Sequence, residues 1–116
     1  TRGRRSVEGL VKGDVVVVPF PFTDLSAVKR RPALVIAALP GDDLILCQIT
    51  SQTVRDGFAI PLSDDDFARG GLRKPSNVRP NRLFTADRGL VVGIVGQVNQ
   101  STMRSVIDAI VRILEA

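Results

Sequence analysis

The side chains that could do chemistry in this chain are arginine, lysine, threonine, serine, aspartate and glutamate, because its 116 residues include no histidine. Histidine is the side chain that ordinarily titrates near neutral pH. Its absence excludes Ser-His-Asp and Cys-His catalysis, histidine-zinc hydrolysis and RNA cleavage by paired histidines. The single cysteine, Cys47, cannot form an internal disulfide or a cysteine metal cluster. Phosphate chemistry stays open, since arginine donates two parallel hydrogen bonds to a phosphate and keeps its charge.

Positive charge is concentrated in two segments. One is the run Lys29, Arg30 and Arg31, and the second, residues 69–88, holds six cations and a single acid. Two cationic segments beside a sheet can follow a phosphodiester backbone. Each charge alone is equally consistent with a solvated loop, and the sequence does not place both segments on one face. The net charge of +4 falls to +1 without the arginines at positions 2, 4 and 5, so the whole-chain charge is weak evidence for RNA binding.

Apolar runs separated by turn residues predict five to seven short strands. Aliphatic and β-branched residues fill them, whereas Gly, Pro and Asp mark the turns. Pro80 predicts an edge or bulged strand, and Gly93 and Gly96 predict bulges or tight bends. The expected strands cover residues 15–18, 32–39, 44–49, 58–62, 78–85 and 90–98. Loops are expected at residues 23–31 and 70–77, and a loop or one helical turn at 64–66.

An amphipathic helix is predicted at the C-terminal end, with Asn99 or Ser101 as its N-cap. Its apolar residues recur at helical spacing between Met103 and Leu114, which favours packing in the core or at a dimer interface. The expected class is therefore mainly β with a C-terminal helix, as a bent sheet or small barrel. Residues 1–11 are predicted to be a flexible basic arm and residues 12–116 a single domain. No apolar run has the length of a membrane span, and no N-terminal apolar region marks the chain for secretion. Together with the single cysteine, this leads us to expect a cytoplasmic protein.

Three segments together resemble the MazF/PemK (Kid) family of toxin endoribonucleases: residues 13–20 (GDVVVVPF), 29–36 (KRRPALVI) and 48–52 (QITSQ). Residues 78–87 and the terminal helix also fit that family. The resemblance implies a small SH3-like β-barrel, the fold of the CcdB, MazF and Kid toxins, used as a homodimer. It implies an endoribonuclease that needs no metal or cofactor and cuts single-stranded RNA at short sequences. It also implies a cognate antitoxin whose acidic tail covers the active site.

The family's functional residues fall on Arg31, which precedes a proline, on Thr50 followed by Ser51, and on Arg79. The chain departs from the family pattern at two places. Residues 25–27 read Leu-Ser-Ala where many members carry a Ser/His-Glu-Gln signature, and Asn81 stands where Kid-like members have an aspartate. Both departures remove a candidate acid/base carboxylate, so the group that accepts the 2′-hydroxyl proton stays open.

The chemistry follows from RNA itself, because the 2′-hydroxyl is a built-in nucleophile that an enzyme has only to orient and deprotonate. Arg31 is expected to stabilise the phosphorane and to be a candidate proton donor, although arginine is a very weak acid. Thr50, supported by Ser51, would bind a phosphate oxygen or the 2′-hydroxyl, and Arg79 a second phosphate oxygen. Asp24 is a possible base, although aspartate is also typical of turns. Further expected RNA contacts are Lys29, Arg30, Gln52, Arg73, Lys74, Asn81, Arg82 and Phe84, the last equally suited to core packing.

Two other functions are compatible with the sequence. A non-catalytic relative on the same fold could bind RNA or a protein target, as the gyrase poison CcdB does, and the missing loop carboxylate favours it. A purely structural barrel is the weakest alternative, because the resemblance covers nearly the whole chain after the arm. An RNA-cleaving toxin remains the leading hypothesis.

Overall fold

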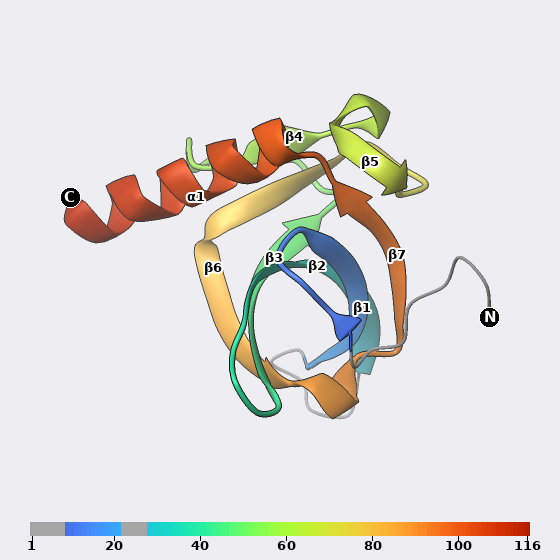
Figure 1. Ribbon diagram of the computed structural model, residues 1–116. Helices are drawn as coiled ribbons and strands as arrows, with labels where there is room; N and C mark the ends of the chain where they lie inside the picture. The colour runs from blue at the N-terminus through green and yellow to red at the C-terminus, as the bar shows by residue number, and fades with distance from the viewer. Residues whose placement is uncertain (1–8, 22–27) are drawn as a thin grey trace.

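A curled antiparallel sheet and one helix make up the fold in the computed structural model, which describes residues 9–21 and 28–116 (Figure 1). The strands are β1 (Asp14–Pro21), β2 (Val28–Ala38), β3 (Asp43–Thr50), β4 (Ile60–Leu62), β5 (Phe67–Gly70), β6 (Ser76–Asp87) and β7 (Gly93–Val98). The helical elements are the short 3-10 turns η2 (Asp64–Asp66) and η3 (Arg88–Leu90), and the helix α1 (Gln100–Glu115). The expected class, mainly β with a C-terminal helix, is confirmed.

The strands form a single sheet in the order β4-β6-β3-β2-β1-β7-β5. Its two edges, β4 and β5, are consecutive in the chain and are separated only by Ser63 and η2. The sheet therefore curls until its edges approach one another, as the ribbon shows (Figure 1). This half-barrel agrees with the small barrel that the sequence predicts.

Strand alternation divides the apolar side chains between two core clusters. In β1, Val15 packs in one cluster and its neighbour Val16 in the other, and the same split separates Leu34 from Val35 in β2. Successive strand residues point to opposite faces, so a continuous apolar run serves both faces of the sheet. The first cluster also contains Met103, Val106 and Ile110 of α1, which shows that the helix covers one face. Cys47 is fully buried in this cluster, as expected of a small apolar residue.

The N-terminus of α1 is capped by Asn99, one of the two predicted caps. Asn99 Oδ1 accepts a hydrogen bond from the backbone nitrogen of Thr102 at 2.8 Å, and its Nδ2 donates to the carbonyl oxygen of Asp65 at 3.1 Å. The Asn99→Ala variant is therefore expected to lose about 1–2 kcal/mol of unfolding free energy, measured by urea denaturation. Ser101→Ala is the matched control, because Ser101 is exposed within the helix. Equal losses in the two variants would contradict the assignment of the cap.

The basic run at residues 29–31 was expected in a loop, and this prediction is wrong. β2 begins at Val28, and Lys29, Arg30 and Arg31 pair with Phe20, Pro19 and Val18 of β1. Pairing along a long neighbouring strand has overridden the weak strand preference of charged residues. The cations consequently have fixed backbone positions in the sheet.

Other strand boundaries also differ from expectation. β5 falls on a segment for which no strand was expected, and Gly70, Ser76 and Asn77 lie in strands although residues 70–77 were expected to be a loop. β6 lies between β4 and β3 in the sheet order, but β4 pairs only with residues 76–78, so Pro80 lies in a part of β6 that pairs with no residue of β4. The bulged alternative for Pro80 is confirmed by the register shift against β3. The last strand is shorter than residues 90–98, because Leu90 ends η3 and residues 91–92 connect η3 to the strand. Its predicted bulge is confirmed by a register shift against β1 between Val15 and Val16.

Candidate functional site

The antiparallel pairing of β2 with β3 brings two of the expected catalytic residues, Arg31 and Thr50, to the same end of the sheet. Ala33 pairs with Gln48. Arg31 precedes Ala33 by two residues and Thr50 follows Gln48 by two, so the antiparallel register carries both toward one end and one face. Arg31 is half-buried and pairs on its other side with Val18 of β1.

Thr50 ends β3 in a local turn. Its side chain is buried, and its Oγ1 accepts a hydrogen bond from the backbone nitrogen of Gln52 at 3.1 Å. A hydroxyl can accept and donate at the same time, so Thr50 can also donate to a phosphate oxygen. The residues that follow, Ser51 and Gln52, are exposed. The turn thus fixes the Thr50 oxygen beside a short accessible segment.

Arg79 lies where β6 bulges away from β3. Val78 pairs with Ile49, but the next pair joins Leu83 to Cys47, so residues 79–82 of β6 stand opposite one residue of β3. The Cys47 thiol donates to the carbonyl oxygen of Arg79 at 2.8 Å. Burial raises the pKa of Cys47 to about 12, against a smaller opposing effect of this hydrogen bond, so the thiol keeps its proton at neutral pH. The bulge is therefore anchored at its base by a buried donor.

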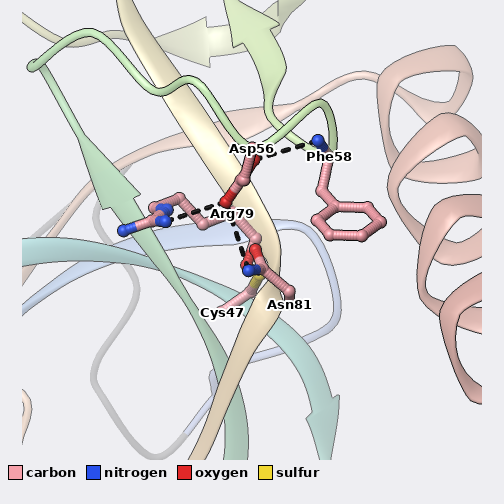
Figure 2. Close-up of polar contacts among 5 residues, drawn as sticks. All are labelled: Cys47, Asp56, Phe58, Arg79 and Asn81. Atoms are coloured by element: carbon pink, nitrogen blue, oxygen red, sulfur yellow. Dashed lines mark hydrogen bonds and ion pairs between the residues drawn. The ribbon is translucent and has the colours of Figure 1, made fainter.

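The side chains of Arg79 and Asn81 on this bulge contact the carboxylate of Asp56, which lies in the loop between β3 and β4 (Figure 2). Asp56 was not identified as a site residue from the sequence. Arg79 Nη2 donates to Asp56 Oδ2 at 2.9 Å, and Asn81 Nδ2 donates to the same oxygen at 3.2 Å. Asp56 Oδ1 accepts from the backbone nitrogen of Phe58 at 3.0 Å. The hydrogen bond from Phe58, followed by that from Arg79, lowers the pKa of Asp56 below the usual range of an aspartate. The group is therefore an ionised carboxylate at neutral pH.

No pattern along the chain pairs Asp56 with Arg79, because the two are 23 residues apart in sequence. The sequence signal for this turn was the dipeptide Asp56-Gly57, which is typical of turns. In the structure, Gly57 has a positive φ of 79° and the Asp56 carboxylate accepts a hydrogen bond from the backbone nitrogen of Phe58. The sequence predicts such a turn but not the strand bulge that it faces. Only the β3–β6 register brings turn and bulge together.

The other expected RNA contacts do not all lie together. Lys29, Arg30 and Arg82 are exposed on β2 and on the β6 bulge, near the three strands that carry the site. Phe84 is half-buried and packs edge-to-face against Phe20, with ring centroids 5.4 Å apart and an interplanar angle of 69°. This contact matches the core-packing alternative for Phe84.

Arg73 and Lys74 line a different pocket. Its other lining residues come from the end of β4, from the β4–β5 connection, from β5 and from the segment before β6: Leu62, Ser63, Asp64, Phe67, Leu72 and Pro75. None of these is part of the Arg79–Asp56 cluster. The possible base Asp24 lies outside the described residues, as do residues 25–27, which differ from the family signature, and most of the predicted arm.

Within residues 9–21 and 28–116, no group of three or more His, Cys, Asp or Glu side chains is arranged to hold a metal ion. In the same part of the chain, no helix has the length and apolar character needed to cross a membrane.

A comparison with known protein families shows to which family this chain belongs. The profile of the family described as "PemK-like, MazF-like toxin of type II toxin-antitoxin system" matches residues 11–114. The chain belongs to this family. The match covers the sheet, the Arg79–Asp56 cluster and nearly all of α1, so the family resemblance noted in the sequence is confirmed.

Solved structures of MazF-like toxins share the fold of this family member. An endoribonuclease from a mycobacterial species, solved with its cognate antitoxin, has a TM-score of 0.72 at 15% identity and covers 92% of this chain and 96% of its own. MazF from Deinococcus radiodurans gives 0.71 at 20% identity, with 92% and 97% covered. Mycobacterium tuberculosis toxin MazF-mt6 gives 0.65 at 18% identity, with 86% and 96% covered. Among curated protein sequences, the comparison found no match. At these identities, the similarity establishes the MazF-like fold.

Proposed function

We propose that this MazF-like toxin is a sequence-specific endoribonuclease that cleaves single-stranded RNA without a metal ion. The observation that carries the proposal is the convergence of Arg31, Thr50 and Arg79 on three adjacent strands, β2, β3 and β6, at one end of a MazF-like sheet. Neighbouring strands lie about 5 Å apart, so the backbones of β2 and β6 are about 10 Å apart with β3 between them, and the long arginine side chains can reach one phosphate bound beside Thr50. RNA supplies the nucleophile, and the protein supplies orientation and charge.

Each residue has a role that suits its chemistry. The Arg31 guanidinium stabilises the negative charge that builds on the phosphorane oxygens, and Arg79 binds a second phosphate oxygen. The Thr50 hydroxyl donates to phosphate while its own oxygen is held by Gln52, and Ser51 supports it from the exposed turn. The attack of the 2′-oxygen on phosphorus breaks the bond to the 5′-oxygen. The products are a 2′,3′-cyclic phosphate and a 5′-hydroxyl.

The proposed partners follow from the family and from charge. A cognate antitoxin with an acidic tail would be attracted to the exposed cations Lys29, Arg30 and Arg82 around the site. One structural neighbour was solved in complex with its cognate antitoxin, which supports this part of the proposal. We further propose a homodimer acting in the cytoplasm, where its RNA substrate is found.

Cleavage by the purified chain tests the function. Wild-type protein incubated in EDTA with an end-labelled, mixed-sequence single-stranded RNA is expected to give a few discrete fragments. The same strand annealed to its complement is expected to stay intact, since the duplex holds the sugar-phosphate backbone away from the in-line geometry that attack needs. Binding of the single strand with intact ends after long incubation would instead establish a non-catalytic relative.

A further inference from the structure

The loop between β3 and β4 presents a carboxylate at the edge of the proposed site. Figure 2 shows the Asp56 side chain held from two sides, by the backbone of its own loop at Phe58 and by Arg79 and Asn81 of β6. Arg79 follows Asn77, the direct partner of Thr50, by two residues. Asp56 thus reaches the strand bulge immediately beside the proposed phosphate site.

Asn81 is the side chain that this arrangement needs. Its amide nitrogen donates to Asp56 Oδ2 at 3.2 Å. An aspartate at position 81 would instead put a second negative charge at hydrogen-bond distance, and like charges so close disfavour ionisation of both groups. The amide at position 81 and the carboxylate at position 56 are therefore complementary, with the acid carried by the loop and not by the strand.

Asp56 also keeps room for a substrate. Its two oxygens offer about four acceptor sites when the group is ionised. Described residues occupy three of these, two on Oδ2 and one on Oδ1, and 26% of the side chain is exposed. The remaining site on Oδ1 can accept a hydrogen bond from an incoming hydroxyl.

We propose that Asp56 is the general base that accepts the proton of the attacking 2′-hydroxyl, and that Arg79 and Asn81 position its carboxylate. The assignment rests on the proposed ribonuclease function. The 2′-hydroxyl proton passes to Asp56 Oδ1 as the 2′-oxygen forms its bond to phosphorus, and the bond from phosphorus to the 5′-oxygen breaks. The 5′-oxygen takes a proton from water, and Asp56 then returns its own proton to water. No net proton is consumed, and no redox change occurs.

The hydrogen bonds that hold Asp56 set the strength of this base. They lower the pKa of Asp56, so the carboxylate is ionised throughout the neutral range. A base whose pKa lies below the working pH is fully ionised, but it is a weaker proton acceptor than a base whose pKa lies near the working pH. Its contribution is expected near the lower end for general-base catalysis, about 10²-fold in rate.

The test compares Asp56→Asn with Asp42→Asn, which changes an exposed acid in the β2–β3 turn. Asp56→Asn is expected to lower kcat by about 10²-fold with little change in KM, whereas Asp42→Asn keeps the wild-type rate. The wild-type rate should be flat across neutral pH and fall only in acid, as Asp56 becomes protonated. The Asp56→Asn rate should rise roughly tenfold per pH unit, because hydroxide must replace the missing base.

A second variant separates catalysis from loop structure. Formate added to Asp56→Ala is expected to restore part of the lost rate by supplying a small carboxylate, and a merely structural role would not respond to it. Wild-type activity in Asp56→Asn would overturn the assignment. Faster cleavage with tighter RNA binding would also overturn it, since Asp56 would then be competing with phosphate for Arg79. Failure of the wild type itself to cut RNA would reject the ribonuclease function together with the base.

Discussion

The Arg31→Ala variant is expected to lose about 10²–10³-fold in the rate of RNA cleavage, the usual effect of removing one preorganised donor to a developing oxyanion. The backbone of Arg31 is fixed by its pairing with Val18 and the residue is half-buried, which limits the conformations open to its side chain when charge builds on the phosphorane. Initial rates on a fluorogenic single-stranded RNA in EDTA measure the loss.

Two further variants make this result specific. Arg31→Lys keeps the charge but not the planar pair of donors, and it should recover only part of the rate. Arg112→Ala removes an exposed arginine from the last turn of α1 and should cut RNA as the wild type does. Unchanged cleavage by an Arg31→Ala protein with a native circular dichroism spectrum would reject the assigned site.

The Gly70→Ala variant is expected to be destabilised by about 2–5 kcal/mol, combining a positive-φ strain with an overpacking clash. Gly70 ends β5 with φ of 66° and packs against β7. An added Cβ would collide with the carbonyl oxygen of Val95 and lie 2.6 Å from the Cα of Gly96. Both neighbours are backbone atoms of the paired strand, so relief requires the β5–β7 pairing to open. The midpoint of urea unfolding measures the loss.

Gly41→Ala is the matched control for the clash. Gly41 also has a positive φ, 87°, but nothing lies within 4 Å of the Cβ that would be added. The Gly41→Ala variant should therefore lose only the strain component of its unfolding free energy, about 1–2 kcal/mol. Equal losses at the two positions would contradict the close approach of β5 to β7.

The class of fold could be predicted from the sequence because apolar runs, turn residues and helical spacing are local signals. The N-cap Asn99 and the bulge near Pro80 belong to the same kind of signal, since each depends on the chemistry of a few adjacent residues. The long strand β2 could not be delimited, because Lys29 to Arg31 have low strand preference and take strand positions through their pairing with β1. Local preference fails where a distant partner supplies the hydrogen bonds.

The candidate site was only partly predictable for a related reason. Arg31, Thr50 and Arg79 were found through family motifs, whereas Asp56 belongs to no motif and gains its position from a register set elsewhere. The basic segment 69–88 also disperses in space. Arg69 lies on β5 and donates to Gln97 Oε1 at 3.2 Å, Arg73 lines a separate pocket, and Arg79 is paired with Asp56. Clustering of charge along a chain does not predict clustering on a surface.

Analysis of the fragment ends tests the central claim most directly. Wild-type protein should be incubated with a mixed-sequence single-stranded RNA in EDTA and the fragment masses determined. Attack by the 2′-hydroxyl predicts upstream fragments that end in a 2′,3′-cyclic phosphate and downstream fragments that begin with a 5′-hydroxyl. Fragments with 3′-hydroxyl and 5′-phosphate ends, or RNA that stays uncut, would contradict the account.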